Sequence, residues 1–234
     1  MKKIFLIVLL LVCVAPLSAQ YADKKTYLSD FKVELMKKWP KNRTLNIVFH
    51  GHSVPSGYAK TPLVATLDAY PHQVMHGLKL RYVHAVLNVI TTAIGGEQSE
   101  QGMKRFKEDV LTHKPDVLLI DYALNDRGIG LERSEKAWRK MIEEALKKGI
   151  KVILLTPTPD QTVDILDRTS ALEKHAEMIR KLAAEYHTGL VDSYAIFREK
   201  VENGEDIKNY MSQVNHPNSA GHLCVASEIL TWFY

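Results

Sequence analysis

Cysteine is scarce in this sequence of 234 residues, where only Cys13 and Cys224 occur. If the N-terminal segment that contains Cys13 is removed, as argued below, one cysteine remains and no intramolecular disulfide can form. Cys224 lies in an apolar stretch near the C-terminus, and we interpret it as a small core residue. Stability must then come from an ordinary hydrophobic core, which a chain of this length can build.

An excess of charge of one sign is also missing. The 31 Lys and Arg residues nearly balance the 27 Asp and Glu residues, which leaves a formal net charge of +4. Loss of Lys2 and Lys3 would lower that value by two. Such a balance gives no reason to expect nucleic acid or an anionic membrane as a partner. The oligomeric state is left open by the sequence.

No hydrophobic run is long enough to span a membrane. The longest one covers residues 4–14, after two lysines, and is followed by the small residues Ser18 and Ala19. This layout is typical of a secretory signal peptide. We therefore predict a signal peptide at residues 1–19 with cleavage near Ala19, a periplasmic or secreted protein, and no membrane attachment after cleavage. An uncleaved N-terminal anchor helix is the alternative.

Residues 20–234 contain no repeat, low-complexity segment or linker, so we expect a single domain. Within it, short runs rich in Val, Ile and Leu alternate with longer amphipathic stretches. The runs predict strands at residues 45–49, 85–89, 117–122, 151–155 and 189–192. The stretches predict helices at residues 24–39, 71–82, 100–112, 134–148, 170–187, 194–203 and 219–232. This alternation predicts a parallel sheet covered by helices on both faces, with ligands bound at the carboxyl ends of the strands.

Four residues suited to chemistry fall at that edge. Ser53 follows the first predicted strand, Gly96 the second and Asn125 the third, while His216 lies in a loop before the last helix. Each alone has a plain structural explanation, as a helix cap, a turn or an exposed loop histidine. Together they are the parts of an acyl-transfer site, with a nucleophile, a base and donors for an oxyanion.

The segments around these residues resemble the four sequence blocks of the SGNH hydrolases, also called GDSL esterases and lipases. Gly51-His52-Ser53 is similar to the Gly-Asp-Ser block, and Ala123-Leu124-Asn125-Asp126 to the Gly-x-Asn-Asp block. Gly96 and His216-Pro217 correspond to the glycine block and to the end of the Asp-x-x-His block. The segments keep the family's order across residues 51–221, which is nearly all of the predicted mature chain.

The resemblance implies a three-layer α/β/α, flavodoxin-like fold with a five-stranded parallel sheet. It also implies Ser53 as the nucleophile, His216 as the base, and an oxyanion hole built from Ser53, Gly96 and Asn125. No cofactor is expected. The substrate would be an acylated small molecule or glycan, most simply an O-acetyl ester on a carbohydrate. A catalytically impaired carbohydrate-binding relative, or a lipase or thioesterase of the same fold, is the alternative.

Three positions depart from the family pattern. His52 stands in place of an Asp, Ala123 in place of a Gly, and Gln213 in place of the triad Asp. Gln213 can orient His216 through its amide oxygen but adds no charge. We expect either a Ser–His dyad helped by Gln213, Ser212 or a backbone carbonyl, or a carboxylate that arrives from elsewhere, with Asp160 and Asp206 as candidates. Three aromatic residues are candidates for the acceptor side, namely Tyr58, Tyr70 and Tyr122.

Two rival sites are disfavoured by spacing. The Gly-x-Ser-x-Pro segment at residues 51–55 lacks the second glycine of the nucleophile elbow of α/β-hydrolases. The ten histidines include His50-x-His52 and a helical pair, His72 and His76, which could bind a metal. Asp68 would extend that pair, but Pro71 places the helix start after it. We therefore expect no metal site.

Overall fold

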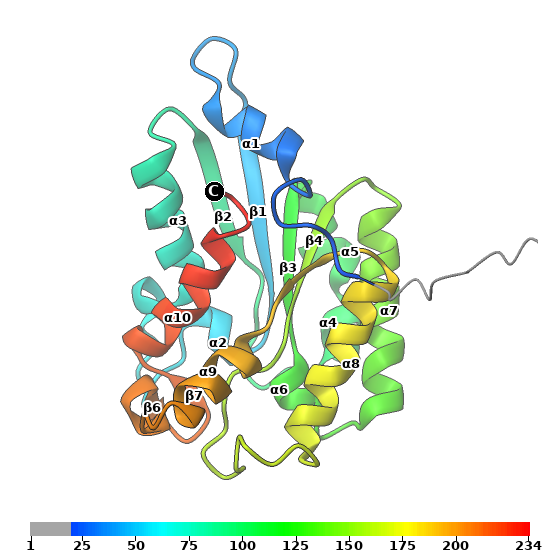
Figure 1. Ribbon diagram of the computed structural model, residues 1–234. Coiled ribbons are helices and arrows are strands. Elements are labelled where there is room, and N and C mark those ends of the chain that lie inside the picture. Colours follow the sequence, from blue (N-terminus) through cyan, green and yellow to red (C-terminus); the bar gives the residue numbers. More distant parts are fainter. Residues whose placement is uncertain (1–19) are drawn as a thin grey trace, which may run out of the picture.

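A computed structural model describes residues 20–234. Its centre is a parallel sheet with the strand order β2-β1-β3-β4-β5 (Figure 1). The strands are β1 (Thr44–Gly51), β2 (Val86–Thr91), β3 (Val117–Asp121), β4 (Lys151–Leu155) and β5 (Gly189–Val191). All five lie within two residues of their predicted bounds. The predicted parallel α/β fold of five strands is confirmed.

Helices cover both faces of the sheet (Figure 1). The longer ones are α1 (Ser29–Met36), α3 (Tyr70–Arg81), α7 (Leu131–Leu146), α8 (Ala171–Glu185), α9 (Ser193–Glu202) and α10 (Ser219–Leu230). Short helical turns connect them, namely α2 (Ser53–Ser56), η1 (Thr66–Asp68), α4 (Ser99–Lys104), α5 (Phe106–Asp109), η2 (Leu111–His113), α6 (Ala123–Asp126) and η3 (Ile207–Tyr210). None of the helices in residues 20–234 is long and apolar enough to cross a membrane. The predicted signal peptide lies outside the described residues.

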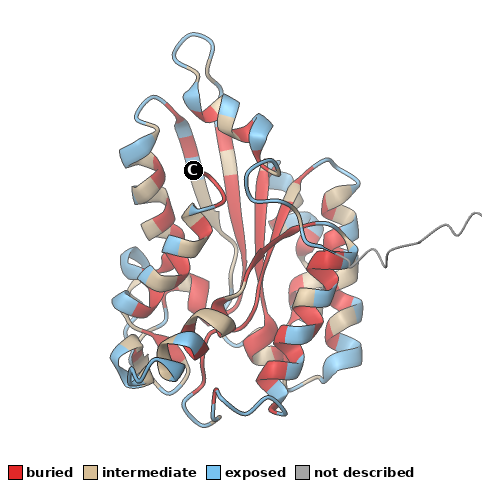
Figure 2. Cartoon of the chain, viewed as in Figure 1, coloured by how far each residue is buried: buried red, intermediate tan, exposed pale blue. Residues whose placement is uncertain are grey.

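The strands divide their side chains between two cores, because neighbouring residues of a strand point to opposite faces. In β3, Val117 and Leu119 join the core under α1, α3, α9 and α10, whereas Leu118 and Ile120 join the core under α5, α7 and α8. β3 is buried along its whole length (Figure 2). This burial on both faces explains why β3 and β4 are nearly continuous runs of Val, Ile and Leu.

The predicted helix at residues 100–112 is wrong, because the segment is broken into α4, α5 and η2. The break lies at Arg105, whose backbone leaves the helical region and whose guanidinium turns inward to Glu97. Two further strands, β6 (Met211–Gln213) and β7 (His216–Pro217), form a small antiparallel hairpin that was not predicted. Each has three residues or fewer, which is too short for a hydrophobic period to emerge.

The carboxyl ends of β1, β2 and β3 meet at one edge of the sheet, where α2, α6 and the hairpin also lie (Figure 1). The register pairs Gly51 of β1 with Asp121 of β3 at this edge. Residues that directly follow these strands are therefore brought close together, as the sequence predicted.

Candidate active site

Ser53 is the first residue of α2, directly after β1. The turn needs a glycine at position 51, because a Cβ atom there would lie 2.4 Å from the Asp121 carbonyl oxygen. His52 then caps the turn by accepting the Val54 N–H at Nδ1, at 3.2 Å. The Ser53 side chain is left 7% exposed at the edge of the sheet. The close approach of two strands and one cap thus fix the position of the hydroxyl.

His216 reaches Ser53 from the other end of the chain. Its Nε2 atom lies 2.9 Å from Ser53 Oγ, and the ring is 9% exposed. The Ser212 hydroxyl donates to the His216 and Pro217 carbonyl oxygens, which fixes the hairpin backbone. The structure therefore brings the predicted nucleophile and base within hydrogen-bond distance across 163 positions of sequence.

Gln213 lies against the far side of the His216 ring, where its Nε2 atom contacts His216 Nδ1. This differs from the expected contact through the amide oxygen. The reason is Thr61, whose backbone N–H donates to Gln213 Oε1 at 3.1 Å and whose hydroxyl donates to it at 3.3 Å. Gln213 thus contacts the ring through its amide nitrogen, which is a donor. The base form of His216, with its proton on Nδ1, requires the amide to turn its oxygen to the ring, and the orienting role of Gln213 stays a prediction.

Neither carboxylate proposed from the sequence reaches His216. Asp160 is bound by Arg127 at 2.6 Å and by Thr162, and Asp206 caps η3 by accepting the Lys208 N–H. Burial lowers the pKa of His216 below its ordinary value, and the neighbouring imidazole of His52 lowers it further. A hydrogen bond to the Ala59 backbone carbonyl opposes this shift. The ring is thus biased toward the neutral form that a general base requires.

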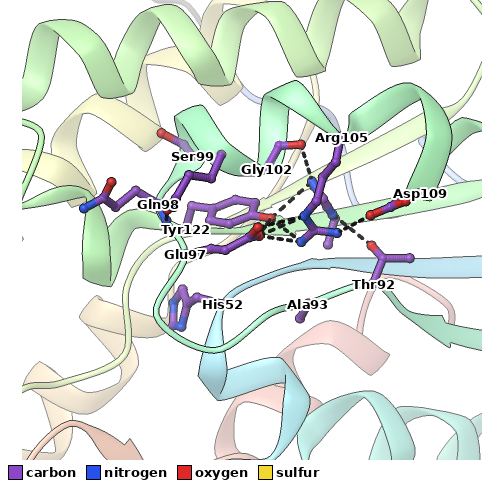
Figure 3. A network of polar contacts seen from close by, with 12 residues as sticks. His52, Thr92, Ala93, Glu97, Gln98, Ser99, Gly102, Arg105, Asp109 and Tyr122 are labelled. Atoms are coloured by element: carbon purple, nitrogen blue, oxygen red, sulfur yellow. Dashed lines mark hydrogen bonds and ion pairs between the residues drawn. The ribbon is translucent and has the colours of Figure 1, made fainter.

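Gly96 lies in the loop after β2 with φ +80°, a conformation that glycine adopts readily. A network of polar contacts behind the loop holds it in place (Figure 3). Within it, Arg105 Nε lies 2.9 Å from Glu97 Oε2, and the Tyr122 hydroxyl donates to the same carboxylate at 3.2 Å. These contacts hold Glu97, and with it the neighbouring Gly96, in position.

Asn125 lies in α6, directly after β3, and its Nδ2 atom donates to the Glu97 carbonyl oxygen at 2.9 Å. One of its two amide hydrogens is thus used to hold the glycine loop, and the second is available to a ligand. The next residue, Asp126, is fully buried and accepts from the Ser99 N–H at 2.7 Å and from Trp138 Nε1 at 2.8 Å. These bonds fix α6 against α4 and α7.

The three aromatic candidates for the acceptor side differ in burial. Tyr70 and Tyr122 are buried, so the expectation that they line the acceptor side is wrong. Their hydroxyls are used inside the protein, by Asp121 and by Glu97 respectively. Tyr58 is 39% exposed, and its ring centroid lies 6.1 Å from that of His216. Of the three, Tyr58 alone can meet a ligand beside the Ser–His pair.

His50, one of the histidines considered as metal ligands, is used otherwise. His50 Nδ1 lies 2.8 Å from Thr92 Oγ1, and its Nε2 lies 3.2 Å from the Gly102 carbonyl oxygen. Between residues 20 and 234, no group of three or more His, Cys, Asp or Glu side chains is arranged to hold a metal ion.

A model of the GDSL-like lipase/acylhydrolase family matches residues 49–223. The chain belongs to this family. The resemblance drawn from the four sequence segments is thereby confirmed, and so is the predicted enzyme class, a serine hydrolase that acts on carboxylic ester bonds.

Known proteins similar to the chain include the acetylxylan esterase of Geobacillus stearothermophilus. It is 26% identical over 196 residues, which cover 77% of this chain and 86% of that enzyme. The uncharacterized lipoprotein YqeF of Bacillus subtilis is 38% identical over 81 residues, which cover 31% of this chain and 33% of the relative.

Solved structures share the fold. A crystal structure of an acetylxylan esterase from Geobacillus stearothermophilus superposes with a TM-score of 0.71 at 22% identity, covering 81% of this chain and 94% of that one. A two-domain esterase active on acetylated mannans gives a TM-score of 0.73 at 23% identity, covering 88% of this chain and 52% of that one.

One pair of residues at the site was missed by sequence reasoning. His52 Nε2 lies 3.4 Å from Asp121 Oδ1, and both side chains are buried. Asp121 ends the third strand, four residues before Asn125, and that placement at the strand edge was the available signal. His52 was noted as a departure from the family's Gly-Asp-Ser block and, with His50, as a possible metal-binding pair, and neither observation pointed to Asp121.

Proposed function

We propose that this member of the family is a secreted or periplasmic esterase that removes O-acetyl or other small acyl groups from carbohydrates. The observation that carries the proposal is the distance of 2.9 Å between Ser53 Oγ and His216 Nε2. The pair stands at the edge of the sheet where Gly96 and Asn125 can supply donors to an oxyanion. No cofactor takes part in this chemistry.

In this mechanism His216 takes up a proton and returns it in each of two steps. His216 Nε2 takes the Ser53 proton as Ser53 Oγ bonds to the ester carbonyl carbon. The negative charge on the carbonyl oxygen is held by the N–H groups of Ser53 and Gly96 and by the free amide hydrogen of Asn125. His216 then gives the proton to the leaving alcohol as the C–O bond breaks. A water molecule, deprotonated by His216, releases the acyl group by the same route.

Two kinds of observation support a carbohydrate ester as the substrate. The relatives include an acetylxylan esterase and an esterase active on acetylated mannans. At the site, the exposed ring of Tyr58 lies beside His216 and offers an apolar surface with a polar edge, which suits the face of a sugar. The small exposed fraction of Ser53 favours a small acyl group, because a bulky one would have to displace the surrounding residues.

A carbohydrate-binding relative without activity is the second candidate, and Gln213 is the observation behind it, since a family carboxylate is missing there. A binding-only protein does not require a serine hydroxyl, an imidazole nitrogen and an amide donor in acyl-transfer positions. The arrangement therefore favours the esterase.

Ser53→Ala tests the proposal. The wild-type protein should hydrolyse 4-nitrophenyl acetate and be labelled at Ser53 by an organophosphate. The variant should lose both properties and keep its melting temperature. Release of acetate from acetylated xylan and mannan, compared with long-chain and thioester substrates, then tests the substrate class. Full activity in purified Ser53→Ala would contradict the proposed nucleophile.

The location has its own test. N-terminal sequencing of protein exported by a bacterial host should give a chain that begins at Gln20. Export with residues 1–19 retained would support an anchor helix in place of a signal peptide.

A further inference from the structure

Ser53 has histidines on two sides. His216 Nε2 lies 2.9 Å from Ser53 Oγ, and His52 Nδ1 lies 3.5 Å from the same atom. The far side of His52 faces Asp121, with 3.4 Å between His52 Nε2 and Asp121 Oδ1. A continuous series of polar contacts therefore runs from Asp121 through His52 and Ser53 to His216.

The backbone N–H of Val54 determines which nitrogen of His52 carries the proton. Because His52 Nδ1 accepts the Val54 N–H, it carries a lone pair, and the proton of the neutral ring is on Nε2. That proton faces Asp121. Within residues 20–234, neither His52 Nε2 nor Asp121 Oδ1 has a hydrogen-bonding partner, and the 3.4 Å between them is an ion-pair distance. The two atoms are left to each other in a buried site, where an unpaired polar group is costly.

Asp121 is held in place by the sheet and by Tyr70. The sheet register fixes its backbone beside Gly51, and the Tyr70 hydroxyl donates to Oδ2 at 2.9 Å. Its side chain is 2% exposed, and that of His52 is 0% exposed. A buried carboxylate is thus kept one imidazole ring away from the nucleophile, on the side opposite Gln213.

We propose that His52, backed by Asp121, supplies the carboxylate assistance that Gln213 cannot give. The inference rests on the proposed esterase function. A buried carboxylate 3.4 Å from His52 Nε2 polarises the ring, because a charge acts strongly in a low-dielectric site, and it makes the lone pair of His52 Nδ1 more negative. This lone pair lies 3.5 Å from Ser53 Oγ, where it stabilises the proton in transit from Ser53 to His216. His52 is a catalytic residue on this reading, since it touches the reacting oxygen, and Asp121 is a positioning residue that acts through it.

Several titratable groups surround this pair and enter any pH dependence. Asp121 and Tyr122 come from the end of β3, Tyr70 from α3, His216 from β7 and His222 from α10. Burial lowers the pKa of His222 to about 4 and raises that of Tyr70 well above 10, so neither changes charge near neutral pH. His216 is the group whose titration the experiment follows.

The test is charge replacement in the exported protein, expressed from the full-length sequence. Asp121→Asn keeps the shape but removes the charge and presents amide hydrogens to His52 Nε2. We expect kcat to fall roughly 10- to 100-fold at nearly constant KM, with the acid limb of the pH profile moved to lower pH. Gln213→Asp, which restores a carboxylate behind His216, should recover most of that loss in the double variant. A merely structural role for Asp121 would not be rescued in this way.

Matched controls separate charge from folding. Glu173→Gln removes another buried carboxylate, one bound by Arg180 in α8, and should leave kcat unchanged. His52→Asn keeps an acceptor for the Val54 N–H but offers no imidazole, and should lose as much kcat as Asp121→Asn. His175→Asn is the corresponding control for a buried histidine.

The outcomes are distinct. Wild-type kcat and pH profile in Asp121→Asn, or a loss that Gln213→Asp does not recover, would overturn this inference while Ser53 labelling still supports the esterase. Absence of labelling and of activity in the wild-type protein would instead remove the proposed function itself.

Discussion

The two histidines beside Ser53 are held in opposite ways. His52 follows a central strand, is completely buried and faces a carboxylate, whereas His216 lies on a two-residue strand of a small hairpin and faces an amide. The ring nearer to the nucleophile therefore lacks a negative partner, and the ring farther from it has one. In a Ser-His-Asp triad, one histidine both contacts the serine and faces the carboxylate. Here His216 makes the closer contact with Ser53, and His52 faces the carboxylate.

The difference between the two histidines bears on the departures from the family pattern at His52 and Gln213. His52 replaces the family's Asp in the first block, and Gln213 replaces the triad Asp in the last. In the fold these two positions approach the Ser53–His216 pair from opposite sides. Both substitutions remove a carboxylate, which leaves Asp121, behind His52, as the carboxylate that our inference assigns to the pair.

The largest effect should come from His216→Ala. If His216 is the base, kcat should fall roughly 10⁴- to 10⁶-fold, nearly as far as in Ser53→Ala, because nucleophile and base act as a unit. Single-turnover kinetics with 4-nitrophenyl acetate measure this loss, and circular dichroism checks the fold. Substantial activity in His216→Ala together with inactive His52→Asn would reverse the comparison and make His52 the base.

Asn125→Ala should have the next largest effect. Loss of one oxyanion donor lowers kcat by roughly 10²- to 10³-fold and changes KM little. Because Asn125 also holds the Glu97 carbonyl, a control must loosen the same loop while the donor is kept. Arg105→Gln does so by weakening the ion pair with Glu97, and its kcat should fall much less. A change confined to KM in Asn125→Ala would make this residue a substrate-binding residue.

The sequence was sufficient for the parallel sheet and for the residues at its edge. Continuous Val, Ile and Leu in residues 117–120 indicate burial on both faces, and the topology then places whatever follows Gly51 and Asp121 at one edge. The same reasoning brought Ser53 and Asn125 to that edge without knowledge of any contact. Helix bounds were predicted less accurately where a polar network interrupts the hydrophobic pattern, as at Arg105.

The partners of these residues could not be predicted. That Thr61 binds the Gln213 oxygen, or that Asp121 faces His52, depends on side-chain packing between segments far apart in the chain. No periodicity encodes such a contact. Burial of Tyr70 and Tyr122 was missed for the same reason, since an aromatic residue near a strand end can turn inward to a carboxylate as well as outward to a ligand.

Gln213→Ala should have the smallest effect and tests the weaker side of the comparison. The Gln213 amide is neutral, so its loss removes one hydrogen bond, worth about 1 kcal/mol, and kcat should fall roughly five-fold.

The active form of His216 is the neutral ring, so activity rises with pH as the proton leaves. Because burial lowers the pKa of His216, the rise should be centred below 6.5 in the wild-type protein and remain near that position in Gln213→Ala. Gln213→Asp should move it upward, since a carboxylate favours the imidazolium. The pH dependence of kcat/KM measures all three proteins, with Thr61→Val as a control that removes the hydroxyl bonded to Gln213 but keeps the backbone N–H. A shift of a full pH unit in Gln213→Ala would show that this amide, and not the opposite side of Ser53, governs the base.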